Sequence, residues 1–187
     1  DINCGVRLLV ANITRKEIQK QLPELATALF HAVPSGVGRG GNLSLSTHDL
    51  DQILLNGAHR MLELGFGIES DLEFCEENGR MPGADASLVT KEAKKRGHDQ
   101  LGTLGSGNHF LEIQAVEEIY DANAAHAFGL SMDAVVIMIH CGSRGLGHQT
   151  CTDYVKIMMS KLSTYGYQLP DRELVCAPVT SQEGHDY

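Results

Sequence analysis

The stretch AVVIMIHCGSRGLG, residues 134–147, decides the fold prediction because it joins three signals in order. Its apolar run from Ala134 to Ile139 is typical of a strand that is buried on both faces. His140 ends the run, and the glycine-rich segment 141–147 predicts a turn. Apolar residues at helical spacing then predict a helix over residues 147–163. We therefore expect a buried strand that carries a histidine into a turn before a helix.

Outside this stretch, strands and helices follow one another without regular alternation. Strands are predicted over residues 6–10 and 109–116, and helices over residues 15–32, 46–64, 87–96 and 117–128. Loops are predicted at residues 35–41 and 101–107, which are rich in glycine, and at residues 65–86, with a short helix in the last. Thr14 and Glu17 form a capping box at the first helix. This order predicts an α+β fold with a mixed sheet core, surrounding helices and long glycine-rich loops.

Composition and charge narrow the class of protein. The 187 residues contain no apolar run of about 18 residues, so no membrane-spanning helix is expected. The five cysteines form no C-x-x-C pair, which fits a reducing compartment, the cytoplasm or, in a eukaryote, the nucleus. The net charge of −9 disfavours nucleic acid as a partner. A basic cluster at residues 91–96 is a local exception, and a solvated helix face is its simplest interpretation.

The two ends of the chain resemble interior sequence. Residues 1–10 enter an apolar strand without an initiator methionine, and residues 183–187 show no polar tail. We therefore expect residues 1–187 to be part of a single domain that is truncated at both ends.

Three segments place a potential metal ligand beside glycine and next to a predicted strand: residues 1–5, with Asp1 and Cys4; residues 105–112, with His109; and residues 140–147, with His140. A carboxylate, a thiolate and two imidazoles suit a borderline divalent ion such as Zn²⁺, Mn²⁺ or Fe²⁺. Because the segments lie far apart in the chain, spacing alone does not establish a shared site. Cys4 as a small buried residue, the histidines as hydrogen-bonded strand ends and Asp1 as a turn residue remain open.

The glycine-rich turns also suggest an anion site. Successive backbone N–H groups in such turns can hold a phosphate, and Ser143, Arg144 and a following helix start would add donors. A structural turn that requires positive φ is the alternative. None of the segments is a P-loop or a dinucleotide-binding fingerprint.

Three long segments, in the same order, closely resemble the signature segments of the RtcB family of RNA ligases: residues 1–7 (DINCGVR), 101–112 (LGTLGSGNHFLE) and 139–149 (IHCGSRGLGHQ). The intervening residues 94–97 (KKRG) match as well. The resemblance covers essentially the whole chain and is far more specific than any single motif. It implies that residues 1–187 are part of an RtcB-like catalytic domain.

The resemblance implies an enzyme that joins RNA ends carrying a 2′,3′-cyclic phosphate or a 3′-phosphate to ends carrying a 5′-hydroxyl. This reaction serves tRNA splicing and RNA repair, so tRNA exon halves or broken RNA are the expected partners. The cofactors would be GTP and two Mn²⁺ ions, with a histidine–GMP intermediate. An activating protein partner is a further expectation, and no membrane is implied.

The resemblance also assigns residues. It makes Asp1 and His109 ligands of one metal and His140 a ligand of the other, with Cys4 bridging both. The implied guanylate pocket comprises Asn108, His109, Phe110, Leu111 and Glu112. Arg144 would hold an RNA or triphosphate anion. The guanylated histidine and one more metal histidine lie beyond Tyr187 in the family, so no catalytic residue is expected in this chain, and the chain alone is expected to be inactive. Cys141 stands where the family has serine.

Two alternatives to a ligase remain. A non-catalytic metal-binding module would keep the ligand cluster without joining RNA. A metal-dependent phosphoesterase would use the same ligands for hydrolysis.

Overall fold

The computed structural model describes residues 2–43 and 45–187, which group into two compact units. The first unit is built mainly from residues 3–43 and 100–144, and the second from residues 45–99 and 145–187. Helices and a small sheet together confirm the α+β prediction. Among the described residues, no helix combines the length and the apolar character needed to cross a bilayer.

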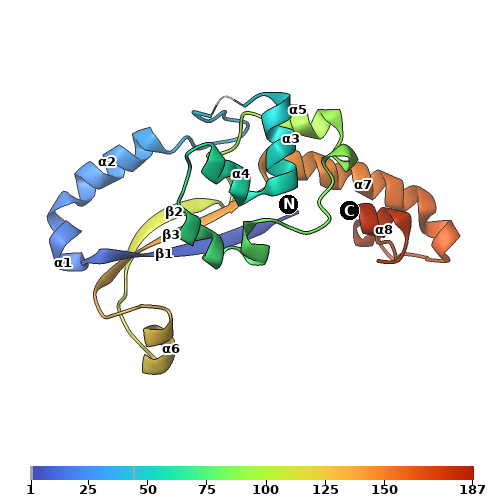
Figure 1. Ribbon diagram of the computed structural model, residues 1–187. Helices are drawn as coiled ribbons and strands as arrows, with labels where there is room; N and C mark the ends of the chain where they lie inside the picture. Colours follow the sequence, from blue (N-terminus) through green and yellow to red (C-terminus); the bar gives the residue numbers. More distant parts are fainter. Residues whose placement is uncertain (1, 44) are drawn as a thin grey trace. The chain divides into compact units, whose positions relative to one another are not determined.

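The first unit is organised by a three-stranded sheet with the order β1-β3-β2 (Figure 1). The strands are β1 (Cys4–Thr14), β2 (Phe110–Ala115) and β3 (Ala134–Gly142). Both neighbours pair antiparallel to β3, so the sheet formed by the described strands is antiparallel and not mixed as expected. The register places Val6 and Phe110 on either side of His140. The central strand therefore carries His140 between two partners.

Burial of the strands differs from the sequence prediction. β3 is fully buried only at residues 134–136 and half-buried from there to its end. β1 is longer than predicted, and its apolar residues are exposed, with Val6 at 51% and Leu9 at 49%. The predicted apolar strand over residues 6–10 is therefore present in β1, but its side chains are exposed, unlike those at the start of β3.

The predicted helix over residues 15–32 is interrupted. It consists of α1 (Arg15–Ile18), the 3₁₀ helix η1 (Gln19–Gln21) and α2 (Leu22–Ala32). Pro23 lies in the first turn of α2, where its missing N–H leaves no hydrogen bond unmade and favours a new helix start. The predicted capping box is confirmed: the Glu17 carboxylate accepts hydrogen bonds from the Thr14 amide (2.7 Å) and hydroxyl (2.6 Å).

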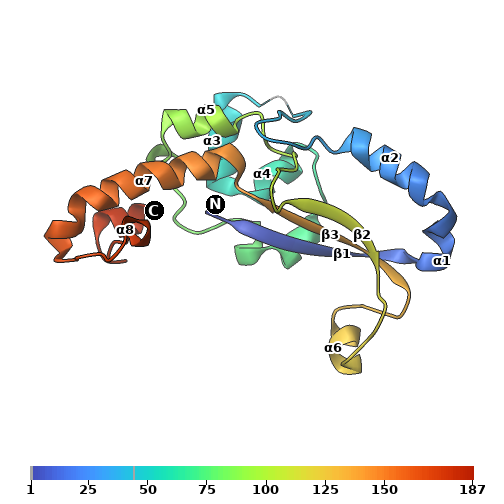
Figure 2. The ribbon, with the colours of Figure 1, turned by 180° about the vertical axis from the view of Figure 1, so that it is seen from behind.

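Helix α6 (Ala122–Ala127) lies on the connection between β2 and β3 and is shorter than predicted. It begins where the Asp121 carboxylate accepts hydrogen bonds from the Asn123 and Ala124 amides, at 2.8 and 3.0 Å. This N-cap ends the extended segment that follows β2. Figures 1 and 2 both show α6 beyond the end of the sheet.

The second unit is helical in the described residues. Its longer helices are α3 (Thr47–Asn56), α4 (Ala58–Glu63), α5 (Lys91–Gly97) and α7 (Arg144–Tyr165), and α8 (Gln182–Asp186) is short. The 3₁₀ helices are η2 (Glu69–Phe74), η3 (Glu76–Gly79), η4 (Ala86–Leu88) and η5 (Arg172–Leu174). Leu50, Ala93, Tyr154 and Met158 are buried in this unit.

Two helix boundaries in this unit correct the sequence prediction. The helix expected over residues 46–64 is divided at Gly57, whose φ of 55° and close approach to the Gly79 carbonyl leave no room for a Cβ. The helix expected from residue 87 begins at Lys91, because the Thr90 hydroxyl accepts a hydrogen bond from the Ala93 amide (3.2 Å) and caps it there.

Candidate metal centre

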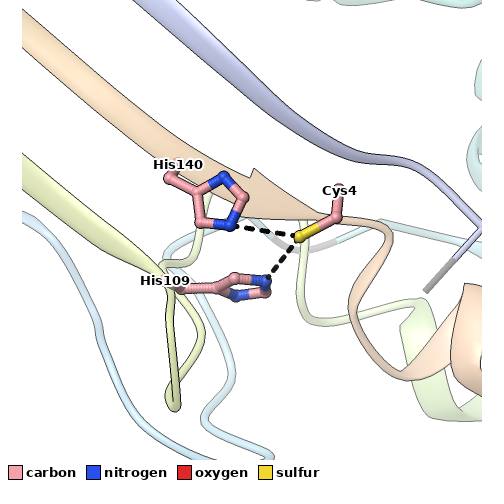
Figure 3. A group of neighbouring side chains, drawn as sticks. All are labelled: Cys4, His109 and His140. Atoms are coloured by element: carbon pink, nitrogen blue, oxygen red, sulfur yellow. Dashed lines mark hydrogen bonds between the residues drawn. The ribbon is translucent and has the colours of Figure 1, made fainter.

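Three side chains from separate parts of the chain meet at one end of the sheet. Cys4 is the first residue of β1, His140 is the third-last residue of β3, and His109 directly precedes β2. Cys4 Sγ lies 3.3 Å from His140 Nε2 and 3.6 Å from His109 Nε2 (Figure 3). The three ligand atoms all lie within 4.8 Å of one another. The antiparallel register produces this meeting, because Cys4 pairs with Gly142, two residues after His140.

The distance from Cys4 to each histidine suits a cation held between the two side chains. Metal–sulfur and metal–nitrogen bonds of about 2.3 and 2.0 Å in tetrahedral geometry put neighbouring ligand atoms roughly 3.5 Å apart. Both measured sulfur–nitrogen distances, 3.3 and 3.6 Å, are close to this value. Cys4 is exposed and the two histidines are half-buried, so the cluster is open to solvent on the Cys4 side.

His140 is oriented by the backbone of β1. Its Nδ1 donates a hydrogen bond to the Gly5 carbonyl oxygen (3.1 Å), which can only accept. The neutral ring therefore carries its lone pair on Nε2, the atom that faces Cys4. The Asn108 side-chain amide also lies 3.1 Å from this Nε2. His140 is thus held in the form that binds a metal.

His109 occupies a loop and not a strand. Its ring stands edge-on to that of His140, with ring centroids 5.5 Å apart and an interplanar angle of 84°. Burial lowers the pKa of His109, and the positive charges of Arg144 and of protonated His140 lower it further. The neutral imidazole, which is the metal-binding form, is therefore favoured near neutral pH.

Arg144 connects the two glycine-rich loops, residues 35–41 and 101–107. Its guanidinium donates to the Thr103 hydroxyl (3.3 Å) and to the Gly36 carbonyl (3.2 Å). Gly36 N in turn donates to the Gly105 carbonyl (3.2 Å). A Cβ at Gly105 would overlap both Arg144 and His109, so only glycine leaves room for both side chains. Two of the Arg144 donors are therefore occupied in positioning the loops.

The prediction of a glycine-rich turn over residues 141–147 is wrong, because most of these residues belong to a strand or a helix. β3 continues through Gly142, and α7 begins at Arg144, so a strand passes almost directly into a helix. The change from strand to helix occurs at Arg144, whose φ is 56°. The glycines at 145 and 147 lie in the helix, where they make no turn.

Of the remaining predicted site residues, some lie beside His140 and others do not. Asp1 lies outside the described residues. Asn108 contacts His140, and the Phe110 ring lies 5.5 Å from the His140 ring. Glu112 accepts a hydrogen bond from Gln114 (2.6 Å) in the same strand. Leu111 instead lines an apolar cavity of about 460 Å³ beside α2, together with Ile113, because alternate residues of β2 face opposite ways.

Sequence reasoning missed the groups that support these side chains. The carbonyl oxygens of Gly5 and Gly36 carry no side-chain signal, and the Thr103 hydroxyl lay inside a segment predicted only as a loop. The glycine-rich character of residues 35–41 and 101–107 was the available clue, because such loops permit close backbone approach.

Comparison with known proteins places the chain. The profile of the family described as "tRNA-splicing ligase RtcB" matches residues 1–187. The tRNA-splicing ligase RtcB of Archaeoglobus fulgidus is 51% identical over 187 residues, which are 100% of this chain and 39% of that protein. The protein of the same name from Thermococcus kodakarensis is 50% identical over 187 residues, again 39% of its length. That from Methanocaldococcus jannaschii is 50% identical over 185 residues, 99% of this chain and 19% of that protein.

The chain therefore spans well under half the length of these relatives. The family match nevertheless extends from the first residue to the last and includes all three members of the cluster. By its sequence, the chain belongs to the RtcB family.

Proposed function

We propose that the protein works as an RNA ligase that joins 2′,3′-cyclic phosphate or 3′-phosphate ends to 5′-hydroxyl ends, in tRNA splicing and RNA repair in the cytoplasm. The observation that carries the proposal is the convergence of Cys4, His109 and His140 within 4.8 Å in a chain matched throughout by one ligase family. GTP and Mn²⁺ are the proposed cofactors.

Two cations are proposed at the cluster. Cys4 would bind both, His109 one and His140 the other, with Asp1 as a further ligand of the His109 ion. A thiolate and two imidazoles fit a borderline divalent ion, and the central position of Cys4 between the two rings fits a shared ligand. Bound cations would neutralise a phosphate and align the attacking and leaving oxygens. Because the same donors favour Zn²⁺ in the usual affinity order, Zn²⁺ should compete with Mn²⁺.

The nucleotide and the RNA end are proposed to bind beside the same residues. Asn108 lies 3.1 Å from the His140 nitrogen that faces the cluster and could donate to a phosphate oxygen there. Phe110 and Glu112 follow on β2 as the proposed remainder of the guanylate pocket. Arg144 keeps its charge close to His109 while it holds the loops, which supports an electrostatic role toward an anion.

The residues of this chain are proposed to bind the cations and to orient the phosphate. They are not proposed to form the covalent intermediate. The guanylated histidine is proposed to lie beyond Tyr187, as the resemblance to the family implies. The neutral histidines would hold cations, and Asn108 and Arg144 would fix the phosphate relative to them.

The test is a joining assay on the protein with Mn²⁺, GTP and two RNAs, one ending in a 3′-phosphate and the other beginning with a 5′-hydroxyl. A His109→Ala variant should bind Mn²⁺ more weakly and lose any joining that the parent shows. The matched control is His126→Ala, an exposed histidine in α6. GTP labelled on its α-phosphate reports separately on guanylation, as label that survives denaturation.

The outcomes separate the alternatives. Joined RNA in the parent full-length protein, lost in His109→Ala, supports the ligase. Mn²⁺ binding by that protein without joining would favour a non-catalytic metal-binding module, and release of phosphate from the RNA would favour a phosphoesterase. A labelled adduct on residues 1–187 alone would contradict the proposed position of the guanylated histidine.

A further inference from the structure

Cys141 follows His140 on β3 and is a half-buried free thiol. Its Sγ lies 3.5 Å from the Thr103 carbonyl oxygen, 4.0 Å from the Gly142 carbonyl oxygen and 3.9 Å from His109 Nδ1. The third contact links this thiol to the ring whose other nitrogen faces Cys4. Cys141 thus contacts His109 at Nδ1, and Cys4 faces the other ring nitrogen, Nε2.

One arrangement of donors and acceptors uses all three contacts of the thiol as hydrogen bonds. A thiol has a single proton to donate and lone pairs that accept weakly. Thr103 and Gly142 present carbonyl oxygens, which can only accept, so the thiol proton is directed to one of them. With the thiol proton used in this way, the sulfur can only accept from His109, so Nδ1 carries a proton in this arrangement. A neutral ring protonated at Nδ1 has its lone pair on Nε2, 3.6 Å from Cys4 Sγ.

The surroundings of His109 support the same orientation. The missing side chain at Gly105 makes the space for the ring edge that carries Nδ1, since a Cβ there would overlap it. The ring is therefore held with one edge against Gly105 and Cys141 and the other toward Cys4.

We propose that Cys141 is a positioning residue, whose thiol fixes the Nδ1-protonated tautomer of His109 so that Nε2 is available to a cation beside Cys4. The inference rests on the proposed metal-binding function of His109. Histidines that bind metals commonly donate their second N–H to a neighbouring acceptor, which sets the tautomer. His140 uses a backbone carbonyl for this purpose, whereas His109 uses a side chain.

The direct test is the tautomer of His109 in metal-free protein labelled with ¹⁵N-histidine, read from its ring nitrogen shifts and couplings. A His109→Gln variant assigns the signal. The parent protein should show a proton on Nδ1, and Cys141→Ser should keep it, because a hydroxyl can also donate to Thr103 and accept from His109. Cys141→Ala should move the population toward the Nε2-protonated form. Cys151→Ala, the control at another half-buried free thiol, should change nothing.

The second readout is calorimetric titration with Mn²⁺ alone. Cys141→Ala should weaken binding by about 10- to 100-fold, as for loss of other outer partners of a ligand histidine, and Cys141→Ser should stay within a few-fold of the parent. Equal affinity and an unchanged tautomer in Cys141→Ala would overturn the inference. So would an Nε2-protonated His109 in the parent, which decides the matter even if the alanine variant does not fold.

The two proposals can fail separately. If no variant and no parent protein binds Mn²⁺ while the tautomers behave as expected, the metal function is rejected and the role of Cys141 stands. If Mn²⁺ binds to the parent but Cys141→Ala leaves both readouts unchanged, the role of Cys141 is rejected and the metal function stands.

Discussion

His140 and His109 approach the same thiol but are held in different ways. His140 belongs to the central strand of the sheet, has a paired strand on each side, and is oriented by a backbone carbonyl. His109 lies in a glycine-rich loop and is oriented by a cysteine side chain and by the space at Gly105. The difference shows that one proposed ligand is fixed by the fold itself, while the other depends on particular side chains that can be substituted.

The largest effect should come from Cys4, the side chain that both histidines share. Cys4→Ala removes the common ligand, so Mn²⁺ affinity should fall by more than about 100-fold, beyond the roughly 10- to 100-fold expected for an outer partner. Calorimetry with Mn²⁺ measures this, and Cys176→Ala, another exposed free thiol, is the control. A smaller loss for Cys4→Ala than for either histidine-to-alanine variant would contradict a bridging role.

An intermediate effect is expected at Gly105, on the loop side of the comparison. Gly105→Ala forces a Cβ against His109 and Arg144, so it should destabilise the protein by about 1–3 kcal/mol. Mn²⁺ affinity should fall by about 10-fold as His109 is displaced. Denaturant unfolding and calorimetry measure the two quantities.

The control for Gly105 is its neighbour Gly107. A Cβ at Gly107 meets nothing within 4 Å, but its φ of 73° strains an alanine. Gly107→Ala should therefore cost stability without loss of Mn²⁺ affinity. Equal losses of affinity at both positions would mean that loop strain, and not overlap with His109, governs binding.

The smallest effect on the metal is expected at Thr103. Thr103→Val removes the hydroxyl that accepts from Arg144 and donates to the Gln100 carbonyl (2.6 Å), which should cost about 1–3 kcal/mol of stability. The Thr103 carbonyl that faces Cys141 remains, so Mn²⁺ affinity should change by less than about threefold, far below the cost of losing an outer partner.

Urea unfolding measures the stability of Thr103→Val, and Mn²⁺ titration measures its affinity for the metal. Thr152→Val, at a half-buried position of α7, controls for the loss of a hydroxyl that donates to a carbonyl of its own helix. A large loss of affinity in Thr103→Val would show that the Arg144 hydrogen bonds, and not the thiol contact, position His109.

Local signals predicted much of the fold. The apolar run before His140, the Thr14–Glu17 capping box and the alternation at residues 109–116 all depend on neighbours in the chain, and each corresponds to an observed element. The break at Gly57 could not be predicted, because it results from contact with Gly79, twenty-two residues away. The exposure of the β1 side chains likewise depends on which elements pack on the faces of the sheet, and not on the strand's own sequence.

The candidate site, like the fold, could be predicted only in part. Residue types identified Cys4, His109 and His140 as potential ligands, and the family motifs grouped them, but their meeting depends on a strand register that the sequence does not state. The contacts that support the two histidines were even less predictable from the sequence. The Gly5 carbonyl becomes the partner of His140 only after β1 and β3 are paired, and Cys141 becomes the partner of His109 only after the loop is placed.

The strand order has a consequence for how the cluster opens. Within the described residues, β3 is paired along both edges, whereas β1 and β2 are each paired along one. Amide hydrogens on the outer edge of β1 should therefore exchange with solvent quickly, and those of β3 slowly, because releasing β3 requires breaking two ladders. Local opening should begin at the exposed Cys4 and reach His140 last. An ion would enter and leave past the thiol, while the histidine on the central strand stays in place.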